Sequence, residues 1–337
     1  MTYEEVRKNA RKHAALCKFC PICDGVACKN TVPGPGAKGS GTVAVRNYNA
    51  WQSIYLNMDT ISEEKSVETS VTLFGQKFSY PIFAAPMGAV GEHFTDCLTQ
   101  ADYDDQLIKG CMESGIAAFT GDGLHDEYFP YACAAIERYG AGVPTIKPWS
   151  KERVFARIDI AKKYGVKIIS MDIDGSGLPF LKNMNPPSGS KTVAELREFI
   201  DYAGVPFIIK GVMTVDGAKK AMDAGAAGIV VSNHGGRVLD HTPATAWVLP
   251  DIAKAVGDKM TVLVDGGIRT GLDVFKALAL GADGVLIGRP FAACVYGAGA
   301  DGVKTYVEKL GAELIDAMQM CGPRSIKEIN ENHIWIP

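Results

Sequence analysis

The sequence has 337 residues, of which 47% are hydrophobic, and its formal net charge is −3. This balance supports a large globular core and gives no basis for binding nucleic acid or an anionic membrane. No apolar stretch reaches membrane-spanning length, and residues 1–16 are charged without the apolar core of a signal peptide, so we expect a cytoplasmic protein. The odd number of cysteines, nine, argues against a disulfide scaffold.

Residues 1–75 are predicted to form an N-terminal extension that contains a cluster of cysteines and a loop rich in glycine and proline at 33–41. The cysteine cluster has the spacing C-x2-C-x2-C-x4-C and consists of Cys17, Cys20, Cys23 and Cys28. Thiolates bind both Zn²⁺ and iron–sulfur clusters, so this is a candidate metal site. The same thiols could instead be redox-active, or simply reduced and without a ligand.

Residues 76–337 alternate short apolar strands with longer helical patterns. Eight such units predict an α/β domain of the (β/α)8 barrel type. The strands are expected at 81–85, 116–120, 143–146, 166–171, 207–209, 229–231, 262–264 and 285–287. The helices are expected at 98–113, 127–139, 151–163, 193–202, 215–224, 247–256, 274–280 and 303–320.

Ionisable residues follow two consecutive strands of this pattern. Lys210 comes directly after the apolar run 206–209, where a charge is costly unless it points at a ligand or a partner. His234 and Arg237 stand three positions apart in a Gly-Gly turn after the next strand. An imidazole can accept a proton near neutral pH, and a guanidinium can bind a carboxylate with two hydrogen bonds. The carboxyl ends of barrel strands form the active site, so these residues are candidates for catalysis.

The last two predicted strands each lead into a glycine turn with an arginine beside it. Asp265-Gly266-Gly267 precedes Arg269, and Gly288 precedes Arg289. Free backbone N–H groups and nearby cations both favour an anion. The loops after strands seven and eight are the common phosphate site of such barrels, so this pair of turns predicts a phosphate-binding pocket.

These motifs, in this order, resemble the FMN-dependent α-hydroxy-acid oxidase and dehydrogenase family, which includes glycolate oxidase and lactate oxidase. The resemblance is close over residues 205–290, looser through 318–329, and can be followed back to residue 81. It implies that His234 is the active-site base, Arg237 the substrate-carboxylate clamp and Lys210 the cation beside the flavin. The FMN contacts that it implies are Ala84, Ala85, Pro86, Met87, Thr120, Ser170, Lys210, Ser232, Asp265, Gly266, Gly267, Arg269, Gly288 and Arg289. Relatives commonly assemble as tetramers or larger, so a homo-oligomer is expected.

The sequence departs from this family where the substrate should bind. A tyrosine that relatives carry in the N-terminal region cannot be placed, and a second arginine that they supply after the fourth strand is absent from residues 171–179. Lys147 is the candidate for the missing cation, and Asp174 is the candidate for contact with an amine or hydroxyl. Either could equally form a structural ion pair.

The favoured function is therefore the FMN-dependent oxidation of a small 2-hydroxy acid, or a close analogue, to the 2-oxo acid. One alternative is an isomerase or lyase that uses the two glycine turns to bind a phosphorylated substrate. Another is a flavin- or metal-holding thiol-redox sensor in which the cysteine cluster is the working part. The presence of both His234 and Arg237 counts against the two alternatives, because neither needs this pair.

Overall fold

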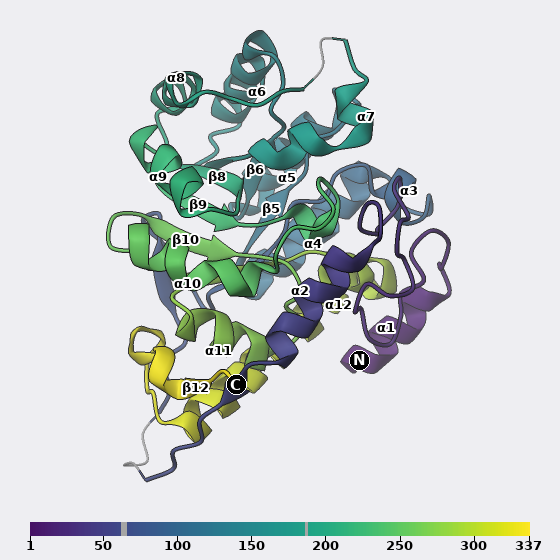
Figure 1. Cartoon of the computed structure of the whole chain (residues 1–337). Helices are drawn as coiled ribbons and strands as arrows, with labels where there is room; N and C mark the ends of the chain where they lie inside the picture. Colours follow the sequence, from purple (N-terminus) through teal and green to yellow (C-terminus); the bar gives the residue numbers. More distant parts are fainter. Residues whose placement is uncertain (62–65, 186–187) are drawn as a thin grey trace.

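Eight parallel strands close into a barrel. The computed structural model describes residues 1–61, 66–185 and 188–337, and Figure 1 shows the sheet with helices around it. In chain order the strands are β4 (Ile82–Ala84), β5 (Ala117–Thr120), β6 (Val143–Ile146), β7 (Ile169–Asp172), β8 (Phe207–Val212), β9 (Gly228–Val231), β10 (Thr261–Val264) and β11 (Gly284–Ile287). Each strand pairs in parallel with the next, and β11 closes the barrel on β4, where Val285 is in register with Ile82. The predicted (β/α)8 barrel is confirmed.

Helices follow the strands and cover the outside of the barrel. They are α4 (Gln100–Glu113), α5 (Tyr128–Tyr139), α6 (Lys151–Lys163), α8 (Val193–Ala203), α9 (Val215–Asp223), α10 (Thr245–Val256), α11 (Gly271–Ala279) and α12 (Arg289–Cys321). Local capping sets several of their ends. At the start of α8, for example, Thr192 and Glu195 exchange side-chain and backbone hydrogen bonds in a capping box. In the described ranges, no helix combines the length and hydropathy needed to cross a membrane.

Two of the differences from the sequence-based expectation concern residues singled out above, Arg289 and Lys210. The last helix, α12, begins at Arg289 rather than at residue 303, with an irregular turn at Ala298 and Gly299. The glycines of this stretch interrupt the helical pattern in the sequence, but Gly297 allows the helix to approach Val6, where a Cβ would lie 2.2 Å from the carbonyl oxygen. Strand β8 continues past Ile209, so Lys210 lies within the strand rather than after it.

The amino-terminal end of the barrel is closed by a hairpin of β2 (Val71–Leu73) and β3 (Gln76–Phe78). Phe78 from this hairpin packs edge-to-face on Phe83, which in turn packs on Phe119 inside the barrel. Apolar side chains therefore fill the amino-terminal end of the barrel, and the polar side chains lie at its carboxyl end. The turn of the hairpin lies at residues 74 and 75, where the sequence analysis places the end of the extension.

The N-terminal extension is docked onto the barrel at several places. Helix α1 (Tyr3–Arg11) packs on α12, with the Tyr3 and Tyr306 rings stacked at a centroid distance of 4.8 Å. Helix α2 (Thr42–Gln52) packs beside α10, as Figure 1 shows. Strand β1 (Tyr55–Leu56) pairs with β12 (Ile334–Trp335) near the C-terminus. These three elements of the extension therefore dock on parts of the chain that follow β9, while its loop between α1 and α2 also contacts earlier parts such as His93 and Phe94.

Candidate active site

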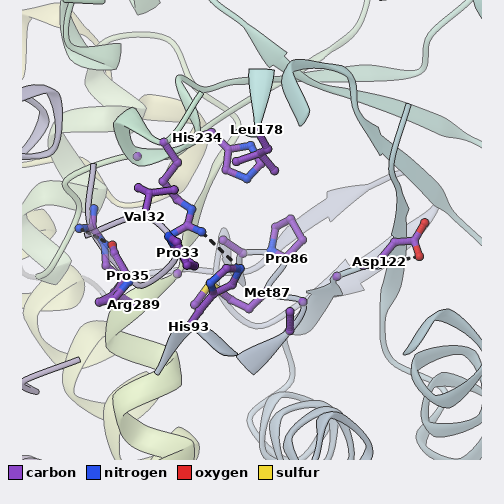
Figure 2. A pocket seen from close by; sticks show the side chains of 18 of the residues that line it. Val32, Pro33, Pro35, Pro86, Met87, His93, Asp122, Leu178, His234 and Arg289 are labelled. Atoms are coloured by element: carbon purple, nitrogen blue, oxygen red, sulfur yellow. Dashed lines mark hydrogen bonds between the residues drawn. The ribbon is translucent and has the colours of Figure 1, made fainter. Parts of the chain in front are cut away.

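A cavity of about 690 Å³ lies at the carboxyl ends of the strands. This volume falls in the range of roughly 300–1,000 Å³ that is typical of cofactor and ligand sites. Figure 2 shows His93, His234 and Arg289 around it, with Val32, Pro33 and Pro35 of the extension beside them. The cavity is therefore bounded by the barrel on one side and by the N-terminal extension on the other.

The loop after β9 presents His234 in a strained turn. His234, Gly235 and Gly236 all have positive φ, at 56°, 63° and 81°. A Cβ on Gly236 would lie 2.7 Å from Val43 and 2.8 Å from Ala37, so only glycine fits beneath the extension here. A non-glycine residue such as His234 rarely takes this conformation, and such strain is found mainly at functional sites.

Asp174 holds the imidazole of His234 in one orientation. Its Oδ1 lies 2.9 Å from His234 Nδ1, and both side chains are largely buried. The carboxylate favours the tautomer with the proton on Nδ1, which leaves Nε2 as the proton acceptor. Burial, together with the Lys210 and Lys147 ammonium groups, lowers the pKa of His234 well below its ordinary value. His234 is therefore a neutral base with a fixed ring.

Arg237 and His93 meet at the side of the cavity that the extension covers. Arg237 donates to the carbonyl oxygen of Gly34, and its Nη2 lies 3.4 Å from His93 Nε2. His93, at the end of the short helix α3 (Val90–His93), accepts the N–H of Gly34 on Nδ1 at 3.2 Å. Burial, reinforced by nearby cations, lowers the pKa of His93 to about 3, so this ring is neutral and carries its proton on Nε2. The N–H donors on His93 Nε2 and Arg237 Nη2 therefore face the same position in the cavity.

Lys210 is the most deeply buried cation of the cavity wall, with 3% of its surface exposed. Its ammonium donates to Ser232 Oγ at 3.1 Å and lies 3.5 Å from Asp265 Oδ2. Burial disfavours its charge, but Asp265, Asp174 and Asp172 outweigh burial and raise the pKa of Lys210. Lys210 is thus a permanent positive charge at the carboxyl end of the barrel.

Lys147 and Asp174, the two candidate substrate contacts, both have protein partners. Lys147 Nζ lies 2.5 Å from Asp172 Oδ2 in a buried ion pair, and Asp174 is engaged by His234. Lys147 nevertheless lines the cavity, so its charge acts on whatever binds there. Asp174 therefore orients the base His234, and Lys147 contributes positive charge to the cavity wall.

Several buried polar atoms at the strand ends lack a partner. Within the described residues, Thr120 Oγ1, Ser170 Oγ and Asp265 Oδ1 accept or donate no hydrogen bond. Buried polar groups are normally satisfied, so unpaired ones at the end of a barrel indicate a ligand with matching donors and acceptors.

The remaining predicted cofactor residues surround the same cavity. Ala84 is buried at the end of β4, and Ser232 is buried beside Lys210. The other residues line the cavity directly: Ala85, Pro86, Met87, Gly266, Gly267, Arg269, Gly288 and Arg289. Most of the residues that the sequence motifs singled out therefore lie together at the carboxyl ends of the eight strands.

The phosphate turn is fixed by the extension. Asn47 and Trp51 on α2 contact the turn Asp265–Gly267: Trp51 Nε1 donates to the carbonyl oxygen of Gly266 at 2.7 Å. A Cβ on Gly267 would lie 2.3 Å from the carbonyl oxygen of Asn47, so the close approach requires glycine. Sequence reasoning found the glycines but not these partners, because α2 lies more than 200 residues earlier in the chain.

Comparison with known proteins identifies the family. The sequence matches the family described as FMN-dependent dehydrogenase over residues 35–179 and 145–336. The chain belongs to this family. It is 48% identical over 323 residues to a peroxisomal (S)-2-hydroxyacid oxidase of Arabidopsis thaliana, covering 86% of each chain. It is 30% identical over 328 residues to glycolate oxidase of Spinacia oleracea, covering 89% of each chain. It also matches the crystal structure of a lactate oxidase from Pediococcus acidilactici with a TM-score of 0.81 and 28% identity, covering 100% of this chain and 95% of that one.

FMN is therefore the cofactor of this FMN-dependent dehydrogenase, and the residues present fit it. The unpaired oxygens at the strand ends match a ring system with polar edges, and Arg269 and Arg289 offer cations for its phosphate. Neither the isomerase or lyase alternative nor the sensor alternative gains support from the family. His93 is the residue that sequence reasoning missed, and its position in the loop after the first barrel strand was the available signal.

We expect Arg289→Ala to weaken FMN binding. Loss of a charge-assisted hydrogen bond to phosphate costs about 1.5–3 kcal/mol, or roughly a 10- to 150-fold rise in Kd. The measurement is titration of the FMN-free protein by quenching of flavin fluorescence.

The matched control is Arg153→Ala, which removes a partly exposed arginine that pairs with Asp126 outside the cavity. An Arg289→Ala protein that binds FMN as tightly as the Arg153→Ala protein would remove Arg289 from the phosphate site.

Proposed function

We propose that this enzyme oxidises a small 2-hydroxy acid to the 2-oxo acid. The observation that carries the proposal is the placement of a neutral, oriented base, His234, and a carboxylate-binding cation, Arg237, in the cavity that fits FMN. The named activities of the relatives in Arabidopsis and spinach agree with this substrate class. FMN, when bound, supplies the chemistry that accepts two electrons from the substrate carbon.

Each side chain has a separate task in this reaction. Arg237 binds the substrate carboxylate and so fixes the α-carbon relative to the base. Nε2 of His234 takes the proton, and Asp174 stabilises the imidazolium that results. Lys210 holds positive charge in a dry site, where it stabilises negative charge that develops on the cofactor side of the cavity.

We further propose that His93 shares the substrate carboxylate with Arg237. The Nε2–H of His93 and Nη2 of Arg237 are both donors, yet they lie only 3.4 Å apart. One carboxylate between them would accept from both and remove the unfavourable contact. This arrangement supplies the second carboxylate donor for which the sequence analysis found no tyrosine or arginine.

We also propose a cytoplasmic location, which purification of the enzyme from fractionated cells would test. Assembly into homo-oligomers is supported by the family resemblance alone. A metal at the cysteine cluster, either zinc or an iron–sulfur cluster, is supported by the close spacing of its four thiols.

The proposed reaction can be followed through the absorbance of the bound flavin. Under anaerobic conditions, a small 2-hydroxy acid should bleach the two visible flavin bands of the purified enzyme. His234→Ala should retain bound FMN but lose bleaching by a factor of at least about 100, since general base catalysis typically contributes 10²–10⁴-fold. Stopped-flow absorbance measures both.

A wild-type protein that holds FMN but is not reduced by any 2-hydroxy acid would refute the substrate class. A His234→Ala protein that is reduced at the wild-type rate would refute the assignment of the base.

The second prediction concerns pH. Because burial and the neighbouring cations lower the pKa of His234, its neutral form persists below pH 6.5, and the acid limb of kcat/KM should lie below that pH. Lys147→Met should move the limb upward, since removing that ammonium, which now lowers the pKa, leaves Asp172 to raise it. An acid limb at or above pH 6.5 in the wild type, or one that moves downward in the variant, contradicts this electrostatic account.

The third prediction tests His93. His93→Ala should raise KM for the 2-hydroxy acid roughly 10- to 150-fold, the effect of losing a hydrogen bond to a charged group, with a smaller change in kcat. His93→Gln, which restores an N–H donor, should recover part of the loss.

His125→Ala is the matched control, because His125 also lines the cavity but is exposed and pairs with Glu92. Equal KM values for the His93→Ala and His125→Ala enzymes would show that His93 does not bind the carboxylate.

A further inference from the structure

The four thiols of the cysteine cluster line one cavity, which is distinct from the FMN cavity but shares Pro35, Arg269 and Arg289 with it. Its volume is about 250 Å³, and it lies between the loop that joins α1 to α2 and the start of α12. The loop is the purple segment next to α1 in Figure 1. All four cysteines are half-buried and free of disulfides. Four soft ligands therefore share one enclosed space.

The loop is held in place mainly by hydrogen bonds to its backbone and by packing of Phe19, with longer contacts of 3.9 Å at the Cys23 and Cys28 sulfur atoms. Arg11 Nε donates to the carbonyl oxygen of Phe19 at 3.2 Å, and Arg7 donates to that of Pro21. Arg269 Nε donates to the carbonyl oxygen of Cys23 at 2.8 Å. The ring of Phe19 is buried against Phe94 and Tyr296. The fold of the loop therefore does not depend on the thiols, which makes them available to a ligand.

The cavity is strongly cationic. Five positively charged side chains line it, and Asp24 is the one carboxylate among its lining residues. The cations are Arg7, Lys18, Arg269, Arg289 and Lys309. Of these cations, Arg269 and Arg289 are shared with the FMN cavity and Lys309 pairs with Glu313, so neither FMN phosphate nor that ion pair accounts for Arg7 and Lys18. Cations stabilise thiolates, the form that binds metal, and the excess charge fits an anionic metal–thiolate centre.

A zinc ion and an iron–sulfur cluster require different spacings of the four thiolates. In a tetrahedral zinc site with Zn–S bonds of 2.3 Å, the four thiolates lie about 3.8 Å from one another. Within the part of the chain that the structure describes, the ligand atoms of Asp172, Asp174 and His234 form the one group of three that lies within 4.8 Å, and no three cysteines do so. In a [4Fe–4S] cluster each of the four cysteines binds a different iron, so the thiolates lie further apart than in a zinc site.

We propose that Cys17, Cys20, Cys23 and Cys28 bind an iron–sulfur cluster. The spacing of the first three cysteines, C-x2-C-x2-C, is that of the bacterial ferredoxin run. The cavity shared by the four thiols and its cationic lining agree with this ligand class, and so does the lack of three thiols within 4.8 Å of one another among the described residues. The site adds a second prosthetic group, on the far side of Arg269 and Arg289 from the FMN cavity.

The test uses the full chain, purified without oxygen, and measures iron, acid-labile sulfide and FMN on the same samples. We expect iron and sulfide in equal amounts, broad absorbance beneath the flavin bands, and an electron paramagnetic resonance signal after reduction with dithionite. Cys20→Ser should lose the iron and sulfide. The matched control is Cys97→Ser, which removes an exposed cysteine outside the cavity and should keep both.

Three results would overturn the proposal. Stoichiometric zinc without sulfide would make the site a zinc centre. Protein that holds neither iron nor sulfide, even after incubation with ferrous iron and sulfide under reducing conditions, would make the cysteines free thiols. A Cys20→Ser protein with wild-type iron content would place the metal elsewhere. The FMN content of each sample reports whether the barrel is folded, and no substrate enters the assay.

Discussion

The active site depends on a single buried charge, the ammonium of Lys210. A desolvated charge is tolerated only when opposite charges and hydrogen bonds compensate it. Asp265 and Ser232 provide that compensation, and each belongs to a different functional loop. Asp265 begins the glycine turn of the phosphate site, while the hydroxyl of Ser232 also accepts the backbone N–H of His234. One ammonium therefore sets the positions of the cofactor turn and of the catalytic base relative to each other.

The barrel alone does not complete this site. Asn47 on α2 exchanges two hydrogen bonds with Asn233, the residue before the base, at 2.8 and 3.0 Å. The segment at Gly34 accepts from Arg237 and donates to His93, which orients the two carboxylate donors toward each other. Buried amide pairs of this kind fix register because an unpaired buried amide is costly. The N-terminal extension is thus a wall of the active site and not an appendage.

Much of this architecture could be predicted from the sequence, because it follows from local pattern. Alternating strands and helices indicated the barrel, and polar residues after apolar strands indicated Lys210, His234 and Arg237 at its carboxyl end. What the pattern could not supply were partners that are distant in the chain. His93 looked like any histidine, because only the fold places it beside Arg237. The first half of α12 was missed because Gly297 and its neighbours interrupt the helical pattern for reasons of packing against α1.

The separation of these partners along the chain also sets an order of assembly. Gly34 lies 203 residues before Arg237, and Cys23 lies 246 residues before Arg269. At ribosomal rates of about 5–20 residues per second, the extension waits roughly 10–50 s for the strands that receive it. Until those strands are made, the extension has no complete surface on which to dock, so it cannot cover the carboxyl end of the barrel before the last third of the chain is synthesised. Delivery of prosthetic groups before that closure needs no passage through the finished wall.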